Sequence, residues 1–207
     1  MSETVGGASP RRIVLATHNP HKVEEFQAIV AATRPDFEVV GYDGPEPVED
    51  GTTFAENALI KARAAAAHTG LPALADDSGI CVDVLGGAPG AFSAYWAGHA
   101  KDAAANLTLL LDQLSDIRDP HRSAQFVSTI ALVDPSGVEH VVEGVWPGRL
   151  AMAASGAGGF GYDPIFVPDD QPTGVQRSVG EWTAEEKNAA SHRARAFHAL
   201  APLLAAL

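Results

Sequence analysis

This 207-residue chain has a single cysteine, no long apolar run and few positively charged residues. The single cysteine, Cys81, cannot form an intramolecular disulfide, and no Cys/His spacing resembles a zinc site, which suits a reducing cytoplasm. No apolar run approaches the roughly 20 residues that a membrane-spanning helix needs, and the first dozen residues lack the apolar centre of a signal peptide. We therefore expect a cytoplasmic protein without a membrane partner, and we interpret residues 1–11 as a flexible tail.

Positive charge is limited to 14 Lys and Arg, against 26 Asp and Glu, for a formal net charge of -12. Nucleic-acid polymers are bound largely through Lys and Arg contacts to phosphates, so the composition argues against such a partner. A phosphorylated small molecule remains compatible with an acidic chain, because a local basic cluster or a metal ion can hold it. The length suits one substantial domain, which we expect over residues 12–207.

Stretches typical of strands alternate with stretches typical of helices. The patterns predict strands at 12–17, 37–42 and 71–75, a hairpin of strands at 122–133 and 138–145, and helices at 20–32, 54–69, 101–114 and from Thr183 to about Leu200. The glycine-dense run 154–168 is expected to be a loop that leads into a strand. Helices interleaved with strands, together with one antiparallel hairpin, predict a single α/β domain with a mixed central sheet flanked by helices.

The first candidate site is THNPHK, residues 17–22, between a predicted strand and a predicted helix. Asn19 suits the N-cap and Pro20 suits the first helical position. A helix N-terminus favours an anion, and Lys22 adds a full positive charge in the first turn, so phosphate is the expected guest. An ordinary capped turn is equally compatible with the spacing.

The second candidate is Asp76-Asp77-Ser78-Gly79, expected at the C-terminal end of the strand at 71–75. Two adjacent carboxylates repel each other and usually need a cation or a hydrogen-bond shell to stay ionised. Oxygen ligands without sulfur suit Mg²⁺, which typically binds one or two carboxylates together with substrate phosphates. Glu49 in the acidic loop 43–51 is a further possible ligand. An Asp-rich turn in water and a solvated charged loop are the alternatives.

Two more segments carry possible binding residues. GGFGYDP, residues 158–164, combines backbone freedom with Phe160 and Tyr162, either of which could stack on a planar ring. The predicted C-terminal helix places Lys187 and Ser191 four residues apart on one face. A tight structural turn and a plain polar helix face are the respective alternatives.

Five segments, taken together and in order, resemble the dITP/XTP/ITP diphosphatases, the Ham1-like family of pyrophosphatases that act on non-standard purine nucleoside triphosphates. The segments are LATHNPHKVEEF, GTTFAENALIKA, LPALADDSGICVDVLGGAPGAFSA, GGFGYDPIFVP and EEKNAASHRARA. They extend over nearly the whole chain after the tail. Five ordered motifs are far more specific than any one of them.

The resemblance implies Mg²⁺-dependent hydrolysis between the α and β phosphates of a nucleoside triphosphate, giving a monophosphate and pyrophosphate, usually in a homodimer. It implies that Asp77 is the catalytic proton acceptor and that Asp77, Glu49 and Asp76 form the metal site. The implied substrate-binding residues are Thr17, His18, Asn19, Pro20, His21, Lys22, Ser78, Phe160, Gly161, Tyr162, Asp163, Lys187, His192 and Arg193. A donor such as His192 or Arg193 would select a 6-oxo purine, which presents an acceptor where adenine presents an amino group.

Two positions depart from the family pattern. Many relatives have glycine at the position of His18, and bacterial relatives commonly have arginine at the position of Tyr95. Two alternatives remain. The first, based on a shared fold, is a Maf-type pyrophosphatase acting on pyrimidine or modified nucleotides. The second is a non-catalytic nucleotide-binding protein in which the change at Tyr95 has cost turnover. Substrate preference in a panel of triphosphates distinguishes the Maf-type activity from the Ham1-like one. Tight ITP binding without hydrolysis would support the nucleotide-binding protein.

Overall fold

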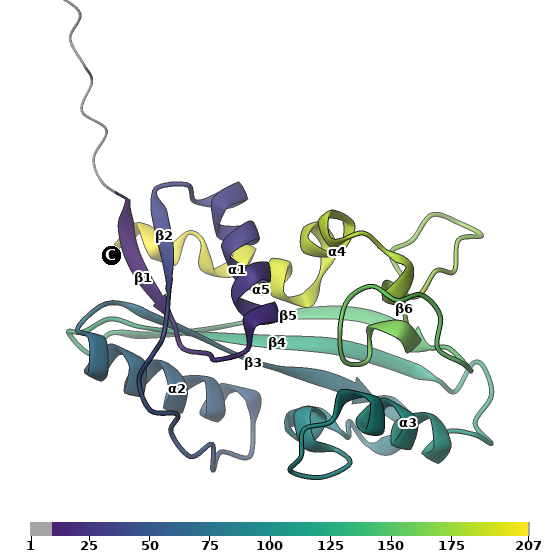
Figure 1. Ribbon diagram of the computed structural model, residues 1–207. Helices are drawn as coiled ribbons and strands as arrows, with labels where there is room; N and C mark the ends of the chain where they lie inside the picture. The colour runs from purple at the N-terminus through teal and green to yellow at the C-terminus, as the bar shows by residue number, and fades with distance from the viewer. Residues whose placement is uncertain (1–9, 207) are drawn as a thin grey trace, which may run out of the picture.

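The computed structural model describes residues 10–206, which form a six-stranded sheet with helices on both faces (Figure 1). The strands are β1 (Arg11–Leu15), β2 (Phe37–Gly41), β3 (Ala73–Val82), β4 (Ser123–Val133), β5 (Glu139–Leu150) and β6 (Phe166–Pro168). Their order is β2-β1-β3-β4-β5-β6. β1 is parallel to β2 and β3, whereas the other neighbours are antiparallel. The predicted mixed α/β sheet and its hairpin are confirmed.

Five α-helices cover the sheet: α1 (Pro20–Thr33), α2 (Phe54–Thr69), α3 (Ala103–Gln113), α4 (Ala184–Ala190) and α5 (His192–Leu200). In Figure 1, α1, α4 and α5 lie on one face, and α2 and α3 lie on the other. Within residues 10–206, no helix has the length and apolar character needed to cross a bilayer. The predicted tail, 1–11, falls almost wholly outside the described residues, and Arg11 is already the first residue of β1.

The centre of the sheet is apolar on both faces, as expected for strands covered twice. Because successive side chains of a strand point to opposite faces, Ile13 and Leu15 pack in a cluster with Phe197 of α5. Val14, between them, packs in a second cluster with the alanines of α2, including Ala62. The small alanine side chains let α2 lie close to the sheet. This alternation decides which way every polar side chain of β3 points.

β3 does not end at Ala75, contrary to the prediction. It continues through Asp76 and Asp77 to Val82, because β4 supplies a partner for every one of its ten residues. The neighbour on its other side, β1, pairs only as far as Leu74. The two aspartates therefore lie in mid-strand, at the point where one edge of β3 becomes free of a neighbouring strand. The sequence pattern shows that polar residues begin at Asp76, but it does not show that β4 continues to pair with them.

The predicted helix from Thr183 to Leu200 is two helices. Ser191, with ψ of 162°, interrupts the helical backbone between α4 and α5. Its side-chain oxygen accepts a hydrogen bond from the backbone N–H of Ala194, which makes it the N-cap of α5. Serine is among the preferred N-cap residues because it satisfies a free N–H of the new helix. The break changes the direction of the chain between Lys187 and His192.

Arg122 is a buried cation with no carboxylate partner within the described chain. Its guanidinium donates to the carbonyl oxygens of Leu114, Ile117, Leu150 and Ala151 at 2.7–2.9 Å. Burial lowers the pKa of Arg122 below its ordinary value, while the carbonyl oxygens satisfy the donors. One side chain thus joins the end of α3, the start of β4 and the end of β5.

The start of α2 offers a first test of these local interactions. Thr53 accepts from the Glu56 N–H at 3.2 Å, and the Glu56 carboxylate accepts from the Thr53 N–H at 3.0 Å. Thr53→Ala removes the side-chain acceptor and should lower the free energy of unfolding by about 1 kcal/mol, measured by urea denaturation. Thr53→Ser keeps the oxygen and should stay near the wild type. Equal losses for both variants would show that the cap contributes nothing.

Candidate active site

A cavity of about 660 Å³ opens among α1, α2, β3 and the segments that lead to β6 and α5, a size typical of small-molecule sites. It is lined by most of the residues singled out in the sequence. Those residues are Thr17, His18, Asn19, His21, Lys22, Glu49, Asp77, Ser78, Phe160, Gly161, Tyr162, Asp163, Lys187, His192 and Arg193. Pro20 and Asp76 do not line it. Segments from five parts of the chain therefore meet at one place.

The N-terminus of α1 forms one wall of the cavity. Asn19 caps the helix as predicted, accepting from the N–H groups of His21 at 3.0 Å and Lys22 at 3.5 Å. Thr17 in turn accepts from the Asn19 N–H at 3.1 Å. These bonds fix the turn after β1 and place Lys22 beside β3, where its ammonium lies 2.7 Å from Asp76.

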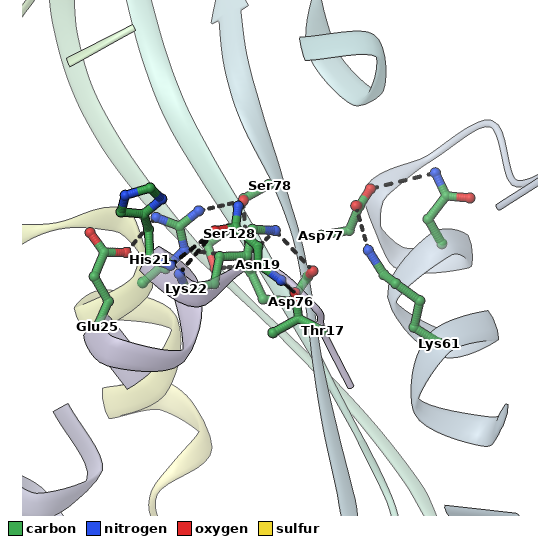
Figure 2. Close-up of polar contacts among 12 residues, drawn as sticks. Thr17, Asn19, His21, Lys22, Glu25, Lys61, Asp76, Asp77, Ser78 and Ser128 are labelled. Atoms are coloured by element: carbon green, nitrogen blue, oxygen red, sulfur yellow. Dashed lines mark hydrogen bonds and ion pairs between the residues drawn. The ribbon is translucent and has the colours of Figure 1, made fainter. Parts of the chain in front are cut away.

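The adjacent aspartates do not face each other. The pleat of β3 sends Asp76 toward α1 and α5, and Asp77 toward α2. Figure 2 shows Asp77 reaching Lys61 on one side of the strand, while Asp76 lies among Lys22 and Ser128 on the other. The two neighbouring carboxylates are thus separated by the pleat, and they pair with different cations.

Asp76 is the centre of a buried polar network. Its carboxylate accepts from Ser128 at 2.6 Å and Ser78 at 3.0 Å and pairs with Lys22 and Arg193, at 2.7 Å and 3.3 Å. Burial alone would raise the pKa of Asp76, but the two cations outweigh it and hold the pKa well below its usual range. Asp76 therefore stays ionised, with both oxygens engaged by the protein itself.

Asp77 is held from the opposite face. Lys61 of α2 contacts it at 2.8 Å and also contacts Glu49 at 2.8 Å, so one ammonium bridges two carboxylates. Asn57 donates weakly to Asp77 at 3.5 Å, and its own carbonyl oxygen is buried with no partner among the described residues. Burial raises the pKa of Asp77, although Lys61 opposes the shift. A carboxylate with a raised pKa is a better proton acceptor than an ordinary one.

The donor set of Asp77 and Glu49 fits a hard cation. Their oxygens converge on a positive charge, the Lys61 ammonium, and Mg²⁺ typically uses only one or two carboxylates with phosphate and water. Within residues 10–206 there is no cluster of three or more His, Cys, Asp and Glu side chains able to hold a metal. Asp76, expected as a third ligand, lies on the other face of β3 and is not brought to this pair.

A second ion cluster ties α1 to α4 and α5. Glu25 contacts Lys187 at 2.7 Å and Arg193 at 2.6 Å, and Lys187 also contacts Asp163 at 2.8 Å. Burial alone would raise the pKa of Glu25, but Arg193 and Lys187 hold it below its ordinary value. The break at Ser191 lets Lys187 and Arg193 reach the same carboxylate although they are six residues apart.

Phe160 presents the aromatic face of the site. The Lys187 ammonium lies 4.3 Å from its ring centroid, and the His21 ring stacks on it at 5.3 Å. Asp163 accepts from the Phe160 N–H at 2.7 Å, which fixes the glycine-rich turn. Tyr162, the other aromatic expected to stack on a ligand, is buried and donates its hydroxyl hydrogen to the Ser93 carbonyl at 2.9 Å. Phe160 is the better placed of the two to stack on a planar ring.

His192 lies in the wall beside this ring. It stacks on Phe126 at 4.8 Å, and its Nδ1 is buried with no partner among the described residues. Burial holds the pKa of His192 well below its ordinary value, so the imidazole is neutral at pH 7. A neutral imidazole has one donor and one acceptor, which suits recognition of a polar base edge.

His18 and Tyr95 occupy the two positions that depart from the family pattern. His18 pairs with Glu46 at 3.0 Å and stacks on Tyr42 at 5.7 Å, so it joins the turn after β1 to the acidic loop. Its backbone is not left-handed, because Lys101 is the one non-glycine residue with positive φ within residues 10–206. No glycine is therefore required at position 18. Tyr95 lines the cavity and stacks on His99 at 5.2 Å.

Three residues that the sequence reasoning missed are central to this arrangement: Glu25, Asn57 and Lys61. Asn57 and Lys61 stand four residues apart in GTTFAENALIKA, on one face of α2, and Glu25 stands three residues after Lys22 on α1. Residues three or four apart on a helix are neighbours. The spacing indicates that these polar residues share a helix face, but it does not indicate which strand that face packs against.

Comparison with known proteins agrees with this geometry. The Ham1 family model matches residues 13–203. A dITP/XTP pyrophosphatase from Leifsonia xyli is 62% identical over 95% of this chain and 96% of its own. A Ham1 protein from Coxiella burnetii, 39% identical, superposes with a TM-score of 0.82 over 95% of this chain and 100% of its own. A dITP/XTP pyrophosphatase from Mycobacterium abscessus, 49% identical, gives 0.72 over 92% and 99%. The chain belongs to the Ham1 family.

Proposed function

We propose that the protein hydrolyses nucleoside triphosphates of deaminated purines, namely dITP, ITP and XTP, to the monophosphate and pyrophosphate. The observation that carries the proposal is the meeting, in one cavity, of a helix N-terminus with Lys22, the convergent pair Asp77 and Glu49, and the aromatic face of Phe160. These are the three kinds of group that a phosphate chain, a hard cation and a purine ring require. Curated relatives that the chain covers almost completely are named dITP/XTP pyrophosphatases.

The phosphate chain is assigned to the turn after β1 and the start of α1. The N–H groups of His21 and Lys22 already donate to Asn19, so the positive end of the α1 dipole is what this helix offers an anion. Lys22 adds a full charge, already placed by Asp76. The residues assigned to this subsite are Thr17, His18, Asn19, Pro20, His21, Lys22 and Ser78.

Asp77 is assigned as the proton acceptor, and Asp77 with Glu49 as the residues that hold Mg²⁺. Bound Mg²⁺ would offset phosphate charge and polarise the bond to be cleaved. Asp77 removes a proton from the attacking water while the oxygen of that water forms a bond to the α phosphorus. The bond from that phosphorus to the bridging oxygen breaks, and pyrophosphate leaves. Asp76, on the other face of β3, is assigned to holding Lys22 and Arg193 rather than the metal.

The base is assigned to the wall built by Phe160, Gly161, Tyr162, Asp163, Lys187, His192 and Arg193. Phe160 stacks on the purine, and His192 donates to the 6-oxo group. Arg193 is less suited to that donation, because its nitrogens already contact Glu25, Asp76 and Ser78. A polar group that is left unpaired in a buried site is costly, so an adenine amino group facing the His192 donor is disfavoured.

The test is a panel of triphosphates with Mg²⁺ and detection of released pyrophosphate. Release from dITP, ITP and XTP, with much lower release from ATP, is expected. A folded protein that releases no pyrophosphate from any of the three would overturn the proposal. A preference for pyrimidine triphosphates would favour a Maf-type activity instead. The proposal includes a cytoplasmic homodimer, which the family resemblance implies, and light scattering during size-exclusion chromatography tests the dimer.

A further inference from the structure

The charges around the cavity are almost all committed to one another. Four cations, Lys22, Lys61, Lys187 and Arg193, are paired with five carboxylates, Glu25, Glu49, Asp76, Asp77 and Asp163. This set has a net negative charge before any ligand binds. A triphosphate brings about four more negative charges, which positioned cations must offset. The paired cations alone leave that requirement unmet.

Lys101 differs from these four cations. It lines the same cavity, and it makes no ion pair or side-chain hydrogen bond with any described residue. The nearest carboxylate in the chain, Asp102, accepts from the N–H groups of Ala104 and Ala105 as the N-cap of α3. Lys101 is therefore an unpaired positive charge that lines the cavity together with His99 and the uncharged Tyr95.

The backbone at Lys101 is also unusual. Its φ of 53° is left-handed, and its N–H donates to the Gly98 carbonyl at 3.2 Å, which closes a tight turn before α3. An L-residue other than glycine, asparagine or aspartate in this region is disfavoured by contact of its Cβ with the backbone. A lysine here is not explained by the needs of the turn, since glycine would form it with less strain. Its ammonium is the remaining reason to place it there.

We propose that Lys101 binds the phosphate chain of the substrate and supplies the positive charge that the paired cations do not. This inference rests on the proposed function, because it names a further contact at the same site. The contact forms when the substrate is bound. It places the phosphate chain between the turn at 98–101 and the N-terminus of α1. It predicts an effect chiefly on KM, and on affinity for a polyphosphate without a base.

The experiment compares Lys101→Gly, Lys101→Asn and Lys101→Arg with the wild type. Glycine and asparagine accept a left-handed backbone, so the urea midpoint should stay equal or rise, while KM for dITP should increase about 10-fold. Lys101→Arg keeps the charge and should stay within about 3-fold of the wild type. Arg12→Gln removes an exposed charge outside the cavity and is the matched control. Affinity for tripolyphosphate with Mg²⁺, measured by calorimetry, should weaken in parallel.

The outcomes separate this inference from the proposed function. Unchanged KM and tripolyphosphate affinity in both neutral variants would overturn the role of Lys101 and leave the hydrolase intact. A wild type without pyrophosphate release, but with tripolyphosphate binding that depends on Lys101, would overturn the hydrolase and support the phosphate contact. Loss of affinity in Lys101→Gly accompanied by a lower urea midpoint, with normal affinity in Lys101→Asn, would assign the effect to the turn and overturn the inference.

Discussion

Asp77→Asn is expected to lower kcat by about 1000-fold while the protein remains folded. The amide has nearly the same shape as the carboxylate, so packing on β3 is retained. It cannot accept a proton from water, and it removes one of the two negative charges that converge on Lys61. Steady-state pyrophosphate release from dITP at saturating substrate measures the loss, and circular dichroism checks the fold.

Two further variants make the Asp77 result interpretable. Asp36→Asn breaks an ion pair with Arg34 outside the cavity and should leave kcat unchanged. Asp77→Ala excludes residual activity that arises when the introduced asparagine deamidates to aspartate. If Asp77→Ala retained more than about a tenth of the wild-type kcat, the proton would have to be accepted by another group, with Glu49 the next to test.

Glu25→Gln is expected to lower the free energy of unfolding by about 3 kcal/mol at pH 7. The change leaves Lys187 and Arg193, both buried, without the carboxylate that joins them. Each cation keeps one other carboxylate partner, Asp163 for Lys187 and Asp76 for Arg193, which holds the loss toward the lower end of the range for broken buried pairs. Urea denaturation followed by circular dichroism gives the free energy of unfolding.

The effect of Glu25→Gln should depend on pH. The pKa of Glu25 is lowered in the folded protein, so its contribution is present above the unfolded-state pKa and is lost as pH falls through the folded-state pKa. The difference between wild type and variant should therefore be full near pH 7 and shrink below about pH 4. Glu24→Gln, at the exposed neighbouring position, should show neither effect. A difference that stays constant down to pH 3 would contradict the ion-pair explanation.

Local features of the fold are predictable from the sequence because they depend on nearby residues. The Asn19 cap and the hairpin around 134–137 require only contacts a few positions apart, and each appears as expected. The end of β3 is not local. It depends on β4, about 50 residues away, which continues to pair with Asp76 and Asp77 after β1 has ended.

The candidate site shows the same division. The motifs that line the cavity are recognisable one by one, and most of their residues do meet. The sequence does not predict which side chains form ion pairs with one another. Neither the bridge from Lys61 to Asp77 and Glu49 nor the contacts of Glu25 with Lys187 and Arg193 could be predicted from it. The helix break at Ser191 could not be predicted for a related reason. The flanking residues have good helix propensity and favour a continuous helix, and only tertiary contacts stabilise the break.

The guanidinium of Arg122 has a consequence for how the molecule opens. Its bonds reach carbonyl oxygens at Leu114 and Ile117 on one side and at Leu150 and Ala151 on the other. Separating any of these segments leaves buried carbonyls or the charge itself without a partner, so the segments gain little by separating one at a time. The end of α3 and the far end of the β4–β5 hairpin should therefore exchange their amide hydrogens as one cooperative unit, although they are more than 30 residues apart in the chain.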